Sequence, residues 1–331
     1  MEIDRKTGTA AGDETEEKRE LSPGGNFSSF AFRFAVSLAL LILIFRTIDF
    51  GAFSGIIVSP KIWPLVFMIV FSLFFVFLGG LKLWVLYKEF NPINPWLFIG
   101  YYFLAGSIGS LAPSIFGDVT LIGLAKRSRI PIHKSISAIL MDRGITLVVA
   151  LFIFTPFTLL FVLPINPGYV FLLTGAVLIV CIGFFKLSLQ FAPSLLGKFK
   201  MTKMLWESFF LFFSHYRPVL YVNLVITSLR SVVSGITLIL ALMAANLNPA
   251  FWATVCISNS LSVLTHIPVS LSGLGLFEGS GLILFEAIGL NREQVLAGLL
   301  YHRVYIITWA ALTSLILTLF FTIKNTGKKY D

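Results

Sequence analysis

Long apolar stretches dominate the sequence, and six of them match the length of a membrane-spanning helix. A helix rises about 1.5 Å per residue, so about 20 apolar residues cross the roughly 30 Å hydrocarbon layer of a bilayer. The six stretches are residues 30–48, 62–86, 135–157, 168–188, 218–245 and 297–323. We therefore predict an all-α, polytopic integral membrane protein with about six full spans.

Two further apolar regions are interrupted by small and turn-forming residues. Residues 95–116 contain several glycines and serines and two prolines, and residues 250–290 hold two short apolar runs around the segment PVSLSGLGLFEG. Irregular backbone at membrane depth is tolerated where protein or a watery cavity covers it. We interpret both regions as re-entrant hairpins. The residues expected at their turns are Pro113, Gly117, Pro268, Ser270, Gly273 and Gly275.

Lysines and arginines between the predicted spans set the orientation in the membrane. With a cytoplasmic N-terminus, the cytoplasmic segments are residues 82–94, 118–134, 186–217 and 324–331. These segments carry fourteen basic residues, against three on the other side. The orientation requires 95–116 to enter and leave from the cytoplasm, and 250–290 from outside. The alternative for 250–290 is two complete helices, but its second run, 279–290, is short for a span.

Composition excludes a soluble protein. Apolar residues make up 57% of the 331 residues and charged residues 12%, with a mean hydropathy of +0.90, whereas soluble domains are about 45–50% apolar and about 25% charged. Cys181 and Cys256 lie in apolar runs, which argues against a disulfide scaffold and a cysteine zinc site. We expect a location in the cell membrane with both termini in the cytoplasm.

The first 29 residues differ from the rest of the chain. They carry seven acidic and four basic residues and few apolar ones, which predicts a disordered cytoplasmic tail, and we expect no cleavable signal peptide here. Residues 30–331 form the membrane domain and have a net charge of +12. This positive charge fits loops beside anionic lipid, and we expect no nucleic-acid partner.

An acid and an arginine recur at one spacing in the two irregular regions. Asp118 and Arg143 are 25 residues apart, and so are Glu278 and Arg303. The flanking spans run in opposite directions in the predicted topology. We therefore predict inverted halves at about 62–157 and 218–323, linked by the span 168–188, an arrangement typical of transporters whose substrate site lies between the repeats.

Ionisable residues inside membrane segments are costly and mark functional sites. Arg143, Arg230 and Arg303 are the candidates to bind an anionic headgroup, because a guanidinium presents a fork of donors suited to phosphate. Asp118 and Glu278 are expected to hold these arginines in place. The alternative is that the charges form internal ion pairs that only fix the hairpins. Asp142 and Arg143 are adjacent on a helix, so we expect them to have different partners.

Motifs for other chemistries are missing. The sequence contains no HExxH, GxSxG or Walker motif, and the glycines of 273–281 do not lie in a βαβ unit. We therefore expect no catalytic residue, no metal and no cofactor.

Several segments resemble the transmembrane-domain family of lysylphosphatidylglycerol synthases, which includes the flippase half of MprF-type proteins and stand-alone members. The segments are PSIFGD (113–118), AKRSR (125–129), MDR (141–143), PVSLSGLGLFE (268–278) and YHR (301–303). The similarity covers most of 30–323. Where family members usually carry an arginine pair around Trp84, this chain has Lys82 and Leu83.

The resemblance implies flippase-like lipid transport, the translocation of a polar or anionic lipid between leaflets. No aminoacyl-transferase domain is expected, so the chain should not be an enzyme by itself. We expect membrane lipids as partners. A lipid-modifying synthase, a glycosyltransferase and further copies of this chain are additional candidate partners. Two alternatives stay open: an ion-coupled small-solute transporter, and a membrane-embedded transferase or partner in a lipid-linked glycan pathway.

Overall fold

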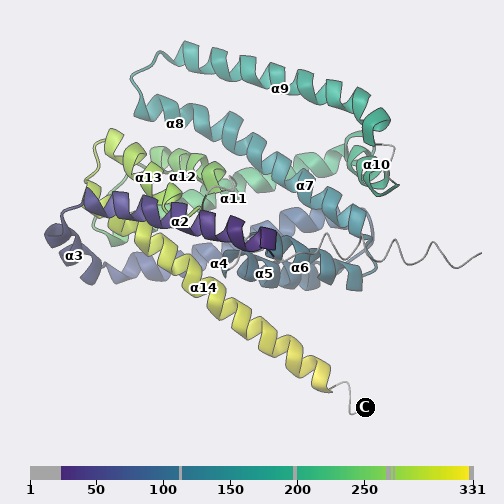
Figure 1. The fold of residues 1–331 in the computed structure, drawn as a ribbon, viewed down its shortest axis with the longest axis horizontal. Helices are drawn as coiled ribbons and strands as arrows, with labels where there is room; N and C mark the ends of the chain where they lie inside the picture. Colours follow the sequence, from purple (N-terminus) through teal and green to yellow (C-terminus); the bar gives the residue numbers. More distant parts are fainter. Residues whose placement is uncertain (1–23, 112–113, 197–199, 266–269, 271–272, 328–331) are drawn as a thin grey trace, which may run out of the picture.

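The computed structural model describes all residues except 1–23, 112–113, 197–199, 266–269, 271–272 and 328–331, and the described part is helical (Figure 1). Its helices in chain order are α2 (Gly24–Arg46), α3 (Phe50–Val58), α4 (Ile62–Tyr87), α5 (Pro95–Leu111), α6 (Ser114–Arg127), α7 (Ile132–Val149), the π-helix η1 (Ala150–Phe154), α8 (Thr155–Val162), α9 (Pro167–Leu196), α10 (Lys200–Ser214), α11 (Arg217–Ala244), α12 (Phe251–Thr265), α13 (Leu276–Ala287) and α14 (Arg292–Gly327). The predicted all-α membrane fold is confirmed.

Five helices, or continuous runs of helix, are long and apolar enough to cross a membrane. They are Ile62–Tyr87, Ile132–Val162, Pro167–Phe184, Arg217–Ala244 and Arg292–Thr313. Each falls on one of the predicted spans. A bent pair, Phe34–Arg46 with Phe50–Val58, would make a sixth.

The first predicted span, 30–48, falls on α2, and the chain bends directly after that helix. α2 begins at Gly24 rather than at residue 30, and α3 leaves it at an angle of 104°. Asp49 lies at the bend and caps α3, since its carboxylate accepts a hydrogen bond of 2.8 Å from the Gly51 N–H. This cap starts a second apolar helix, α3, directly after the bend.

Two pairs of short helices replace continuous spans in the irregular regions. At about 1.5 Å per residue, α5, α6, α12 and α13 are about 26, 21, 23 and 18 Å long, each shorter than a bilayer core of about 30 Å. This geometry agrees with hairpins, and their entry from opposite sides stays a prediction, as does the inverted repeat. Two predicted turn residues, Pro113 and Pro268, lie outside the described residues.

Glycines allow both hairpins to close. Gly273 and Gly275 have backbone φ angles of 75° and 79°, values that residues with a side chain rarely adopt. Gly275 directly precedes the first residue of α13. Gly117 brings α6 against α5, because a Cβ there would lie 2.7 Å from the Ala105 carbonyl oxygen. Ser270 is buried beside the second hairpin.

We expect Gly117→Ala to destabilise the protein by about 1–3 kcal/mol, because the backbone of α5 leaves no space for the added methyl group. Gly100→Ala on α5 is the matched control, since its added Cβ would meet no atom within 4 Å. Thermal unfolding of the two purified variants in detergent measures the difference. Equal midpoints for Gly117→Ala and the wild type would contradict the close contact.

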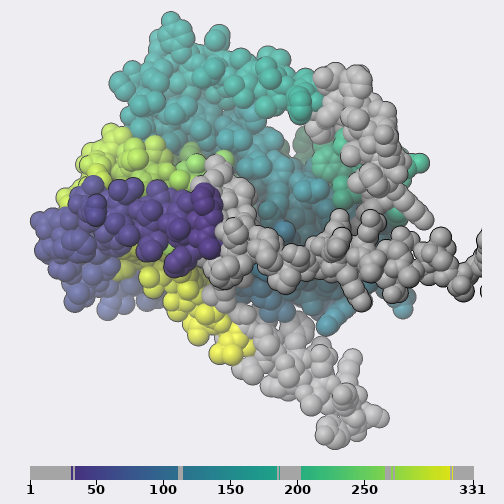
Figure 2. Space-filling model, viewed as in Figure 1, coloured from purple at the N-terminus to yellow at the C-terminus, as the bar shows by residue number. Residues whose placement is uncertain are grey.

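α11 lies at the centre of the packed helices. It packs closely against α4 and also against α12, α14 and α7. Leu238 and Leu242 of α11 are fully buried in the core with Leu261 of α12 and Leu299 of α14. At the edge, α9 packs mainly on α8 and α10 and exposes much of its apolar surface (Figure 2).

Some segments predicted as cytoplasmic loops are helical. α6 extends through residues 118–127, and α10 occupies much of 186–217. α10 is amphipathic and buries Phe212 in a core cluster with Tyr87 and Ile130. Residue 82, which the sequence placed at the start of a loop, belongs to α4, because the apolar residues 83–87 prolong that helix.

Candidate functional site

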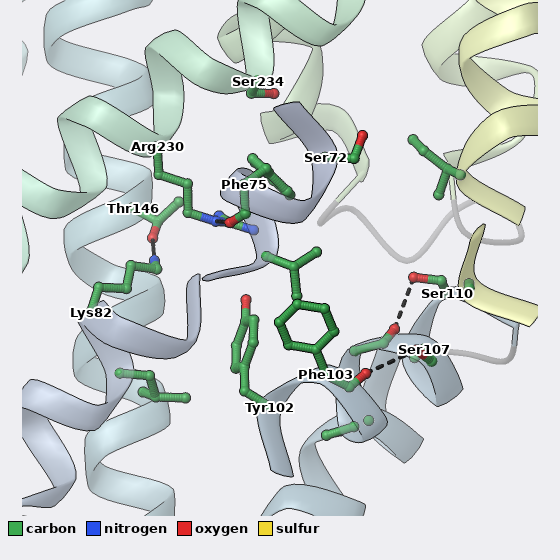
Figure 3. A pocket seen from close by; sticks show the side chains of 18 of the residues that line it. Ser72, Phe75, Lys82, Tyr102, Phe103, Ser107, Ser110, Thr146, Arg230 and Ser234 are labelled. Carbon is green, nitrogen blue, oxygen red and sulfur yellow. Dashed lines mark hydrogen bonds between the residues drawn. The ribbon is translucent and has the colours of Figure 1, made fainter. Parts of the chain in front are cut away.

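A cavity of about 500 Å³ opens between α4, α5, α6, α7, α11, α12 and α14 (Figure 3). Its charged lining residues are Lys82, Asp118, Asp142, Arg143 and Arg230. Three cations and two anions give the described lining a formal charge of +1. The volume lies within the range of about 300–1,000 Å³ that is usual for small-molecule sites.

Lys82 and Asp142 form a buried ion pair between α4 and α7. The Lys82 Nζ lies 2.9 Å from an Asp142 carboxylate oxygen, and the lysine side chain is 2% exposed. Lys82 also donates a hydrogen bond of 2.8 Å to the Thr146 hydroxyl (Figure 3). Asn223 of α11 donates to the other Asp142 oxygen, at 3.1 Å, and to the Lys82 carbonyl, at 2.8 Å. The pair thus joins three helices at the cavity wall.

Asp118 and Arg143 form a second ion pair, between α6 and α7. The Arg143 Nη2 lies 2.5 Å from an Asp118 oxygen. The two side chains are 39% and 30% exposed, so water reaches both. Asp142 and Arg143 therefore have different partners, as their adjacency on one helix predicts.

Arg230 lies halfway along α11 and forms no salt bridge with any described residue. Its guanidinium stacks on the Phe75 ring, with the Cζ 3.8 Å from the ring centroid, and its Nε donates a hydrogen bond of 3.3 Å to the Phe75 carbonyl oxygen. Figure 3 shows the guanidinium reaching into the cavity beside Lys82. A guanidinium that stacks on an aromatic ring at a cavity wall, with no carboxylate partner among the described residues, is suited to an anion.

Glu278 and Arg303 form the other pair of the 25-residue spacing. The Arg303 Nε lies 2.8 Å from one carboxylate oxygen of Glu278, whose side chain is fully buried. The other oxygen accepts a hydrogen bond of 2.7 Å from the Gly275 N–H, and an Arg303 nitrogen donates to the Gly273 carbonyl at 3.3 Å. This cluster ties α13 and α14 to the predicted hairpin turn.

The structure thus divides the five predicted headgroup residues. Asp118, Arg143 and Arg230 line the cavity, whereas Glu278 and Arg303 are not among its described lining residues. Sequence reasoning missed Lys82 as a site residue. The signal was a lone lysine followed by five apolar residues, which places it inside the helix rather than in the next loop.

A comparison with protein families gives one decisive match. The family model described as "Lysylphosphatidylglycerol synthase TM region" matches residues 30–315, most of the chain. The chain belongs to this family. No curated protein and no solved structure matched the chain.

Membership of the lysylphosphatidylglycerol synthase TM-region family establishes two points. The protein is a multi-pass membrane protein, in agreement with its apolar helices, and its function is connected with membrane lipids. The matched family is that of the transmembrane region, without the aminoacyl-transferase domain.

Proposed function

We propose that this protein moves a lipid with a polar or anionic headgroup between the two leaflets of the cell membrane. The headgroup occupies the cavity and the acyl chains stay in the bilayer. The barrier to spontaneous flipping is the cost of removing a charged or polar group from water. A cavity lined by charged and hydroxyl groups replaces the lost hydration and lowers this barrier.

Arg230 is the observation that carries the proposal. Among the cationic side chains of the cavity, Lys82 and Arg143 each contact a carboxylate, whereas Arg230 makes no salt bridge within the described residues. Its charge is compensated by a ring face and one carbonyl oxygen. An incoming phosphate would supply the missing negative charge. Asp118 and Asp142 hold the neighbouring cations, and Arg143 becomes available to the phosphate when it leaves Asp118.

The test is lipid movement in reconstituted vesicles. Purified protein is placed in vesicles that contain fluorescent phosphatidylglycerol, and a reductant that cannot cross the bilayer measures how fast label reaches the outer leaflet. We expect Arg230→Gln to slow this movement at least tenfold, since a hydrogen bond to a charged group contributes about 1.5–3 kcal/mol. Proton and sodium gradients are applied in separate runs.

Arg217→Gln is the matched control, because Arg217 begins the same helix and its side chain is exposed. We expect it to move lipid within about twofold of the wild-type rate. The proposal fails if the wild-type protein moves no lipid under any gradient, or if Arg230→Gln moves lipid as fast as Arg217→Gln. Flux of a soluble anion without lipid movement would indicate a solute transporter instead.

A further inference from the structure

A cluster of hydroxyl groups lies outside the cavity, where the continuous helical run of α7, η1 and α8 meets α12. Both η1 and α8 pack against α12 (Figure 1). Thr155 and Thr158 of α8 face Ser260 of α12, with distances between hydroxyl oxygens of 3.2 Å and 2.8 Å. None of the three belongs to the described lining of the cavity, so the proposed lipid movement gives this cluster no role.

The backbone beside the cluster departs from an α-helix. Residues Ala150–Phe154 form the π-helix η1, and the Thr155 N–H donates to the Ala150 carbonyl oxygen, five residues earlier instead of four. Pro156, the second residue of α8, has no N–H, so the preceding turn has one backbone donor fewer than it has carbonyl oxygens. π-Helical turns of this kind are frequent at functional sites.

The cluster has more oxygen–oxygen contacts than protons. Each hydroxyl group lies close to one carbonyl oxygen of its own segment: Thr155 on Ala150 at 2.9 Å, Thr158 on Phe154 at 3.2 Å and Ser260 on Cys256 at 3.1 Å. The two contacts between hydroxyl groups raise the number to five, whereas three hydroxyl groups have only three protons. At least two contacts therefore bring oxygen lone pairs together with no proton between them. A cation among these oxygens removes their repulsion.

The chemistry of these oxygens restricts which cation fits. All of them are neutral, and neither α8 nor α12 contains an acidic or basic residue. Arg143, the last charged residue of α7, is twelve residues before Thr155, about 18 Å along the helix. Divalent cations are held mainly by carboxylates, whereas backbone carbonyls of broken transmembrane helices bind sodium. The site therefore suits a monovalent cation, and motifs of histidine, cysteine or acidic residues do not reveal it.

We propose that the hydroxyl groups of Thr155, Thr158 and Ser260, with the neighbouring carbonyl oxygens, form a binding site for a monovalent alkali cation. The bound cation joins the run of α7, η1 and α8 to α12. Both segments also line the cavity, through Thr146, one turn before η1, and through Asn259, next to Ser260. Cation binding therefore holds two walls of the cavity together. This inference does not depend on the proposed lipid movement.

The test measures binding of radioactive sodium to the purified full-length protein in detergent, with choline chloride keeping the ionic strength constant. We expect saturable binding that unlabelled sodium displaces, and a higher unfolding midpoint in sodium chloride than in choline chloride. Thr158→Val/Ser260→Ala should lower the affinity for sodium at least about tenfold and abolish the difference in midpoint. This variant should fold, because replacing both members of a buried hydroxyl pair by apolar groups of similar shape changes stability little.

Thr174→Val/Ser228→Ala is the matched control. Thr174 of α9 and Ser228 of α11 each donate to a carbonyl oxygen of their own helix, and neither bonds to another hydroxyl group within the described part of the chain. This variant should bind sodium within about twofold of the wild-type affinity.

Three results overturn the inference. The first is a wild-type protein without displaceable sodium binding, and this result needs no variant to fold. The second is displacement of sodium by choline or calcium as readily as by unlabelled sodium. The third is a Thr158→Val/Ser260→Ala protein that binds sodium as tightly as its control. Sodium binding to a protein that moves no lipid supports this site and overturns the proposed function alone.

Discussion

Lys82→Met is expected to destabilise the protein by about 3–5 kcal/mol, because it leaves the Asp142 carboxylate in a largely buried position without its cation. Methionine fills nearly the same volume, so little of this loss comes from packing. Asn223 still donates to Asp142, but one amide does not replace an ammonium at 2.9 Å. Thermal unfolding in detergent should show a fall of several degrees in the midpoint.

Lys88→Met, at the C-cap of the same helix, is the control, since the Lys88 side chain is 40% exposed and its Nζ lies 3.9 Å from a Glu89 carboxylate oxygen. An exposed pair of this kind contributes about 0–1 kcal/mol. Equal midpoints for Lys82→Met and Lys88→Met would show that the ion pair does not stabilise the fold.

The double variant Lys82→Met/Asp142→Asn separates folding from function. Removing both charges avoids an uncompensated buried ion, so stability should return to within about 1–2 kcal/mol of the wild type. Lipid movement should not return, because the cavity keeps fewer charges to replace the hydration of a headgroup. A double variant that is both stable and fully active would assign the pair a purely structural role.

The spans could be predicted because each needs only a long apolar run, and length and hydropathy are properties of one segment at a time. Helix α3 was missed for the same reason, because its nine residues are too few for a span. Arg46, Thr47 and Asp49 end the first apolar run, and hydropathy does not reveal that Asp49 caps a new helix at 104° to α2.

From the sequence, a salt bridge could be predicted only where a repeated spacing between an acid and an arginine restricted the choice of partner. Asp118 pairs with Arg143 and Glu278 with Arg303, each across 25 residues, whereas Lys82 lies 60 residues from Asp142 on another helix. No periodicity within a helix connects such residues. The polar lining of the cavity was missed because its members come from several helices, and a lone serine in an apolar run looks like ordinary helix packing.

Glu278→Gln is expected to cost about 3–5 kcal/mol of stability, whereas Asp118→Asn is expected to cost about 1 kcal/mol or less, although both change one member of a pair at the same spacing. The Glu278 side chain is fully buried and Arg303 is 17% exposed. Glutamine keeps one acceptor oxygen for two donors, the Arg303 Nε and the Gly275 N–H. The Asp118 pair is open to water, which screens its charges.

The rate of lipid movement should be more sensitive to Asp118→Asn than to Glu278→Gln. Asp118 and Arg143 line the cavity, whereas Glu278 and Arg303 are not among its described lining residues. Asp118→Asn should change the rate of movement in a protein of near wild-type stability, and Glu278→Gln should lower the amount of folded protein with little change in the rate per folded molecule. Glu286→Gln, at a 47% exposed position of α13, is the control for the helix itself. Unfolding midpoints and vesicle assays on the same preparations measure both quantities. If Glu278→Gln instead slows a stable protein, the buried pair takes part in transport, and the headgroup path extends beyond the cavity to the second hairpin.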